Sequence, residues 1–124
     1  MNFKMILVVA LGGAIGSVAR YLMMSGVGHF WKSSFPLSTL LVNVLGSLVI
    51  GMLTEFMVQH GHFSLPMRTF LIAGILGGFT TFSTFSLDAG FLIQKGAWFL
   101  TSLYVVGSVG ISLLAFFGGM AIFR

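Results

Sequence analysis

The chain of 124 residues contains no cysteine and very little charge. Without cysteine it can form neither a disulfide framework nor a thiolate metal site. Only 6% of its residues are charged, against roughly a quarter in a soluble domain, whereas 57% are hydrophobic. This balance excludes a soluble globular protein and indicates an integral membrane protein.

Charges of either sign are scattered singly along the chain. Six Lys and Arg stand against two acids, which gives a formal net charge of +4 at pH 7. Nucleic-acid binding requires a basic run or patch, and no such run is present, so we expect no nucleic-acid partner. Isolated cations between apolar segments are typical of the flanks of membrane spans.

Four apolar runs cover most of the chain, each close to the roughly 20 residues that a helix needs to cross a bilayer. The runs extend over Met5–Met24, Leu37–Met57, Thr69–Phe91 and Gly96–Phe123. Short connectors with turn-forming residues such as Pro36 and Pro66 separate them. The sequence therefore predicts a single all-α domain, residues 1–124, with four transmembrane helices. The first run is full length and contains Arg20, so we expect it to be retained and not cleaved as a signal peptide.

The orientation of a membrane protein follows the distribution of Lys and Arg near its helix ends. The two sides of this chain carry three each: Lys4, Arg68 and Arg124 on one side, and Arg20, Lys32 and Lys95 on the other. A chain without bias is expected to insert both ways up, and opposite copies can then pair about a two-fold axis in the membrane plane. We predict an antiparallel, dual-topology homodimer. The alternative is a single orientation, with Arg20 buried and left out of the count.

Small residues recur every four positions along the first span, at Gly12 and Gly16, with Arg20 next in the series. This spacing lets two helix backbones approach closely in lipid, so we predict a packing face there. An arginine within a span is expensive and usually faces protein or a wet cavity. Arg20 could draw anions into a vestibule or extend to the lipid headgroups, and its position leaves both roles open.

Polar side chains follow one face of the second span and one face of the fourth. Asn43 begins a series with Ser47 and Gly51 at intervals of four. Its amide needs a partner, because an unpaired amide in hydrocarbon costs several kcal/mol. That partner is either the backbone or a hydroxyl group of another helix, or a permeating ion. The fourth span carries a hydroxyl stripe about two turns long, formed by Tyr104, Ser108 and Ser112.

The third span contains the stretch GGFTTFSTFSLD, in which an aromatic residue followed by a hydroxyl residue recurs every three positions. The aromatic positions are Phe79, Phe82 and Phe85, and the hydroxyl positions are Thr80, Ser83 and Ser86. The pair Gly77-Gly78 before two threonines is a poor continuous helix and predicts a break in mid-membrane. Carbonyls freed by a break are cation ligands. The electropositive ring edges of phenylalanine suit a small anion, although packing is the commoner role of Phe.

The chain closely resembles the CrcB/Fluc fluoride channel family in three stretches: GGAIGSVARY (Gly12–Tyr21), LLVNVLGS (Leu40–Ser47) and GGFTTFSTFSLD (Gly77–Asp88). The resemblance spans all four helices, and the third stretch is the most specific. It implies a passive fluoride-selective channel in the plasma membrane of a prokaryote, a dual-topology homodimer with two pores that exports cytoplasmic fluoride and gives fluoride resistance. It implies no catalytic residue and no enzyme activity. Asp88 is the main departure, since the family often has Glu there, and it keeps the charge.

The resemblance also assigns roles to residues. It places in the pore Asn43, Phe82, Phe85, Tyr104, Ser108 and Ser112, and we add Ser83 and Thr84 from the same motif. It implies a structural sodium ion on the two-fold axis, held by the backbone carbonyls of Gly77 and Thr80 from both subunits. Arg20 is our candidate for the vestibule.

Two other functions fit parts of the sequence. A small dual-topology proton-coupled multidrug exporter is equally short and four-helical, but exchange needs a titratable group in mid-membrane. Glu55 and Asp88 lie towards the ends of their spans. A structural subunit without transport would explain the small-residue faces but would leave the polar stripes without a role.

Overall fold

The computed structural model describes residues 2–124, which contain four helices long and apolar enough to cross a membrane. The first, second and fourth are continuous, whereas the third is assembled from four consecutive segments. The elements are α1 (Phe3–Phe30), α2 (Leu37–His60), α3 (Leu65–Arg68), the π-helical η1 (Thr69–Leu76), α4 (Gly77–Phe79), α5 (Phe82–Gln94) and α6 (Trp98–Ile122). The predicted all-helical, four-span architecture is confirmed.

The helix ends differ from the predicted ends, because local capping and not hydrophobicity decides where each helix stops. The first span continues to Phe30, six residues beyond the expected Met24, since the segment between them contains no proline. The second span ends where Gly61 takes the left-handed conformation, with φ of 63°. The fourth begins at Trp98 and not at Gly96, because Gly96 has φ of 73° and forms the turn.

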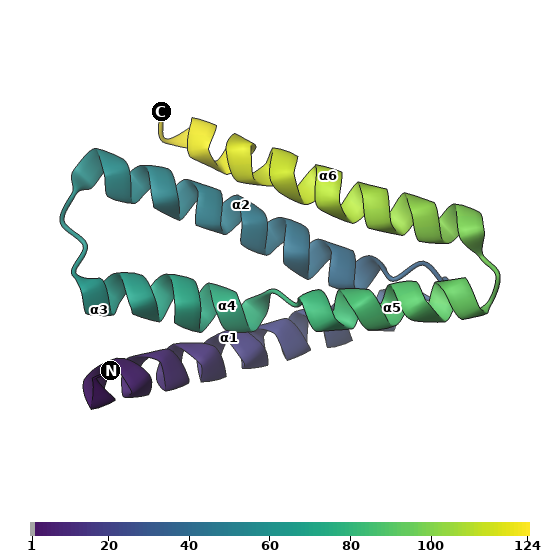
Figure 1. Ribbon diagram of the computed structural model, residues 1–124, viewed down its shortest axis with the longest axis horizontal. Coiled ribbons are helices and arrows are strands. Elements are labelled where there is room, and N and C mark those ends of the chain that lie inside the picture. Colours follow the sequence, from purple (N-terminus) through teal and green to yellow (C-terminus); the bar gives the residue numbers. More distant parts are fainter. Residues whose placement is uncertain (1) are drawn as a thin grey trace.

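The spans form two adjacent pairs (Figure 1). α2 runs alongside α6, and α1 packs against η1 and α4 of the third span. Both chain ends and the connector from α2 to α3 lie at one end of the bundle, whereas the other two connectors lie at the opposite end. Lys4, Arg68 and Arg124 therefore lie towards one end and Lys32 and Lys95 towards the other, as predicted, whereas Arg20 lies ten residues before the end of α1 and not at its end as expected.

The contact between α1 and the third span depends on glycines that meet backbone directly. A Cβ atom added at Gly12 would lie 2.6 Å from the carbonyl oxygen of Phe70, and one added at Gly16 would overlap the carbonyl of Ile75. From the opposite side, a Cβ at Gly78 would lie 2.8 Å from the carbonyl oxygen of Gly13. The predicted packing face on the first span is confirmed, and its partner is the half of the third span before the break.

The third helix is broken, as predicted, within the stretch from Gly77 to Thr81. Gly77 and Gly78 are helical, whereas Thr80 and Thr81 are extended, with ψ of 157° and 113°. α1 approaches so closely that Gly78 has no room for a side chain, whereas a Cβ at Gly77 would make only an ordinary contact, 3.5 Å from the carbonyl oxygen of Ile72. The break itself follows from hydrogen bonds at Thr80 and Thr81.

The α2–α6 contact gives a prediction with a control at the adjacent residue. A Cβ at Gly119 would overlap the carbonyl of Leu48 on α2, whereas a Cβ at Gly118 would meet nothing within 4 Å. Because overpacking typically costs about 1–3 kcal/mol, we expect Gly119→Ala to lower the midpoint of thermal unfolding in detergent. Gly118→Ala should leave the midpoint unchanged, and equal midpoints for the two variants would contradict this packing.

Candidate functional site

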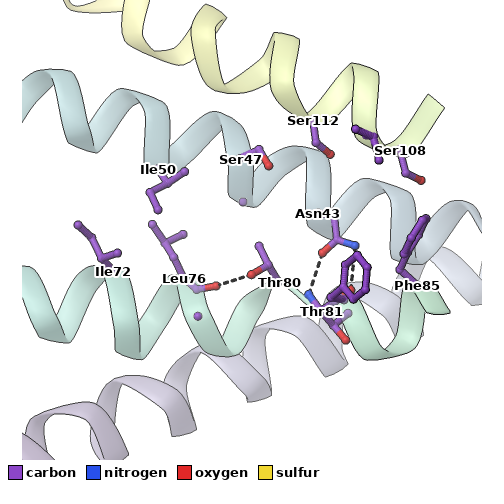
Figure 2. A pocket seen from close by; sticks show the side chains of 14 residues that line it. Asn43, Ser47, Ile50, Ile72, Leu76, Thr80, Thr81, Phe85, Ser108 and Ser112 are labelled. Atoms are coloured by element: carbon purple, nitrogen blue, oxygen red, sulfur yellow. Dashed lines mark hydrogen bonds between the residues drawn. The ribbon is translucent and has the colours of Figure 1, made fainter. Parts of the chain in front are cut away.

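The break in the third span is held by the side chain of Asn43, which reaches across from α2 (Figure 2). The Asn43 Oδ1 atom accepts a hydrogen bond of 2.8 Å from the N–H of Thr81, and Nδ2 donates one of 3.0 Å to the carbonyl of Thr81. Of the two partners considered for Asn43, the structure therefore identifies the backbone of another helix. An amide nitrogen has two hydrogens, so one N–H of Asn43 remains available for a further acceptor.

Hydroxyl groups form hydrogen bonds with backbone groups at the two helix ends that face each other at the break. The carbonyl of Leu76 accepts both the N–H and the hydroxyl of Thr80, each at 3.0 Å, where α4 ends. The hydroxyl of Thr81 accepts the N–H of Thr84 at 3.1 Å and so caps the start of α5. The Ser83 hydroxyl lies 3.2 Å from the same oxygen of Thr81.

These bonds redirect two N–H groups away from the carbonyls that they would meet in a continuous helix. In an α-helix, an N–H bonds to the carbonyl four residues earlier. The N–H of Thr81 would bond to Gly77, but it bonds to Asn43. The N–H of Thr84 would bond to Thr80, but it bonds to the Thr81 hydroxyl. Gly77 and Thr80 thus each have a carbonyl whose ordinary helical donor is engaged elsewhere.

A cavity of about 410 Å³ opens beside the break, between α2, the third span and α6. Its polar part combines the Asn43 amide with hydroxyl groups from three helices, and its apolar part is aliphatic and aromatic. None of the described lining residues has an acidic or basic side chain. They are Asn43, Gly46, Ser47, Ile50, Ile72, Leu76, Gly77, Thr80, Thr81, Phe82, Phe85, Ser108, Val109 and Ser112.

Five predicted pore residues meet in this cavity, together with both predicted cation ligands. Phe82 and Phe85 lie with their ring centroids 5.3 Å apart and their planes tilted by 48°. Their environments differ, because Phe82 is 76% exposed whereas Phe85 is 9% exposed. The ring of Phe82 is thus free to contact a molecule outside this chain, and the ring of Phe85 is fixed within it.

Ser108 and Ser112 on α6 face the cavity from the side opposite the break (Figure 2). The side chain of Ser108 is buried, yet within residues 2–124 its Oγ atom has no hydrogen-bond partner. A buried hydroxyl without a partner costs roughly 1–3 kcal/mol. Such a group beside a cavity is expected to serve a ligand or water that enters it.

Other predicted residues lie outside the cavity. Tyr104 is fully buried, with its ring centroid 5.2 Å from that of Phe85, and its hydroxyl donates to Asp88 Oδ2 at 3.1 Å. Ser83 is exposed and Thr84 is half-buried, and both contact the Thr81 cap. Arg20 is half-buried on α1 and makes no ion pair with the described part of the chain.

Thr81 was not among the predicted pore or cation-binding residues, although it takes part in more hydrogen bonds at the break than any of them. The doubled threonine after a glycine pair was a usable signal, because the second hydroxyl can cap a new helix. Ser47 also lines the cavity, and its spacing of four from Asn43 already placed it on the same face.

Four spanning helices around a cavity of amide, hydroxyl and aromatic groups define a small multi-pass membrane protein with a polar site at the break of one helix. The chain belongs to the CrcB family, because residues 7–120 match the family model described as CrcB-like protein, Camphor Resistance (CrcB).

Relatives over nearly the whole length share one description, fluoride-specific ion channel FluC. The chain is 50% identical to the protein of this name from Rhizobium meliloti over 119 residues, 96% of this chain and 95% of the relative. It is 47% identical to the one from Agrobacterium fabrum over the same shares. Identity to the one from Nitrobacter winogradskyi is 45% over 124 residues, 100% of this chain and 98% of the relative. The four spans and these bacterial relatives make the chain a multi-pass protein of a prokaryotic plasma membrane.

Proposed function

We propose that this protein is a passive channel that lets fluoride leave the cell and thereby gives fluoride resistance. The observation that carries the proposal is the cavity at the break, where an available amide N–H, a buried hydroxyl without a partner in residues 2–124 and two phenylalanine rings meet, with no titratable side chain among the described lining residues. The relatives named as fluoride-specific channels share this chain's sequence at 45–50% identity.

The mechanism follows from what a small, strongly hydrated anion needs in order to leave water. Asn43, Ser108 and Ser112 offer N–H and O–H donors, and the edges of Phe82 and Phe85 are weakly positive. None carries a full charge, so no single position binds the anion too tightly for it to move on. An inside-negative potential drives an anion outward with about 2.3 kcal/mol per 100 mV for each charge, so no coupling to another ion is required.

The working form in this proposal is an antiparallel homodimer with two pores. Three of the six Lys and Arg lie nearer one end of the bundle and three nearer the other, with Arg20 in the second half of α1, and this even distribution allows the chain to insert both ways up. The cavity is open on one side, and Phe82, one of its lining residues, is mostly exposed. A second copy lying alongside in the opposite direction would cover this ring and close the pore wall.

A structural sodium ion fits the break. Gly77 and Thr80 present carbonyls without their ordinary helical donors, and unwound carbonyls of this kind are sodium ligands in transporters with broken helices. One chain supplies two such oxygens, and a two-fold axis through the break would bring together four. When bound, the ion would supply a fixed positive charge and satisfy these carbonyls in place of the missing donors.

The proton-coupled exporter is the main competing function, and the cavity argues against it. The buried acid Glu55 is bonded to Gln59 at 3.0 Å and lies 3.8 Å from Arg124, near one end of the bundle. Asp88 is bonded to Tyr104. In liposomes at neutral pH, we expect an imposed proton gradient to leave the rate of fluoride efflux unchanged. A rate that requires the gradient would favour the exporter.

Topology provides a separate prediction. Because three cations lie nearer each end of the bundle, reporters fused at the C-terminus should be found on both sides of the membrane. Two or three Lys added after Arg124 should bias one orientation and impair transport, and an oppositely biased copy expressed alongside should restore it. A reporter on the unaltered chain that is confined to one side would exclude the dual-topology dimer.

A further inference from the structure

The backbone of Thr81 and its hydroxyl form the centre of the hydrogen bonds at the break. Thr81 is 5% exposed, and both of its backbone polar groups are engaged by Asn43. Its hydroxyl accepts the N–H of Thr84, and Ser83 lies within hydrogen-bond distance of the same oxygen. Each of these bonds keeps the chain extended between α4 and α5.

We propose that Thr81 and Asn43 are positioning residues for the cation site, because each removes one competing donor from one cation ligand. Asn43 engages the N–H that would otherwise close the helix onto the Gly77 carbonyl. The Thr81 hydroxyl engages the N–H that would otherwise bond to the Thr80 carbonyl. This inference rests on the proposed sodium site, and it explains why both carbonyls are available rather than only one.

The geometry shows why a side chain is needed for this task. A helix that has just been interrupted can repair itself by returning each N–H to the carbonyl four residues earlier. At the end of α4, the N–H and the hydroxyl of Thr80 both donate to the carbonyl of Leu76, so this helix end needs no further donor. The Thr81 hydroxyl plays the matching role at the start of α5. Without it, the N–H of Thr84 would be left free and the Thr80 carbonyl would be its nearest helical alternative.

Asn43 also connects the cation site to the anion cavity. The same side chain that holds the Thr81 backbone also lines the cavity, and its amide has one N–H left for a further acceptor. A cation that fixes the break therefore fixes the orientation of this N–H as well. The two sites are linked through one side chain and one backbone unit, and the coupling between them must be reciprocal.

The test measures how strongly sodium stabilises the purified protein, and not how fast the protein transports. A ligand that binds only the folded state raises the midpoint of thermal unfolding as its concentration rises. The protein in detergent is titrated with Na⁺ at constant ionic strength, with N-methylglucamine as the replacing cation. The variants are Thr81→Val and Thr81→Ala, which lack the hydroxyl, and Thr81→Ser, which keeps it.

Thr101→Val is the matched control. Thr101 is also buried, but its hydroxyl donates within its own helix, to the carbonyl of Ala97 at 2.7 Å, far from the break in sequence and in a different span. It tests whether the loss of any buried threonine hydroxyl alters the response to sodium.

We expect Thr81→Val and Thr81→Ala to need roughly five- to tenfold more Na⁺ for half of the full stabilisation, as the recovery of one competing hydrogen bond implies. Thr81→Ser and Thr101→Val should keep the Na⁺ dependence of the unaltered protein. If the unaltered protein responds to sodium but the hydroxyl-free variants respond identically, the positioning role is wrong and the sodium site stands. If the unaltered protein shows no response specific to sodium, the sodium site itself is wrong.

Discussion

Replacing Asn43 by aspartate is expected to lower fluoride efflux from liposomes by at least roughly 100-fold, on the scale of losing hydrogen bonds to a charged group. An ionised carboxylate can still accept the N–H of Thr81. It has no N–H for the Thr81 carbonyl and none for an anion, and it places a negative charge beside the cavity. The break and the anion path are thus damaged by the same change.

Asn43→Ser is the comparison that separates the two effects. Serine is too short to repeat both bonds of the amide, but it keeps one hydroxyl donor and adds no charge. Its efflux should fall between that of the unaltered protein and that of Asn43→Asp. All preparations are compared by size-exclusion elution, so that unfolded protein is recognised. Efflux from Asn43→Asp equal to or above that from Asn43→Ser would show that Asn43 does not face the anion.

The second large effect is expected at the two phenylalanines of the cavity. Phe82→Ile and Phe85→Ile keep an apolar side chain but remove the electropositive ring edge. Edge interactions of aromatic rings are worth about 0.5–1.5 kcal/mol, so each change should reduce efflux by about two- to tenfold. Transport is measured as fluoride efflux from liposomes, with the same protein examined by size exclusion.

The two phenylalanine variants should differ in stability, which serves as an internal control. Phe85 is buried, and its ring packs against the ring of Tyr104, so Phe85→Ile should lose up to about 1.5 kcal/mol of stability. Phe82 is 76% exposed within one chain, so Phe82→Ile should leave the fold of each subunit unchanged. Near-normal efflux from well-folded forms of both variants would show that the rings serve only in packing and that the hydroxyl groups alone line the anion path.

The fold could be predicted from the sequence because lipid imposes its own pattern on a spanning helix. Apolar runs of the required length and short connectors gave four helices. Which residues of the predicted break are extended could not be predicted as closely. Gly77 and Gly78 are the obvious local weakness, yet both are helical, and Gly78 is needed for the close approach of α1. The extended residues are held by Asn43, which lies 38 positions earlier in the chain, and such a contact leaves no periodic signal.

The candidate site was predicted more completely for residues that point into the cavity than for residues that support it. Asn43, Ser108 and Ser112 could be predicted because a polar side chain on an apolar helix is costly unless it has a hydrogen-bond partner. Tyr104 shares the stripe on α6 but is directed to Asp88, and only the packing of α5 against α6 reveals this. Thr81 could not be distinguished from the neighbouring hydroxyl residues by sequence, because its role depends on backbone hydrogen bonds that the sequence does not reveal.

The central claim is tested most directly by loading liposomes that contain the purified protein with equal concentrations of fluoride and chloride. Valinomycin then releases the counter-charge, and ion-selective electrodes record both anions outside. We predict prompt efflux of fluoride while chloride is retained, because the cavity offers compact donors and ring edges without a full positive charge. Absence of fluoride efflux, or chloride leaving at a comparable rate, would contradict the assignment of this protein as a fluoride-selective channel.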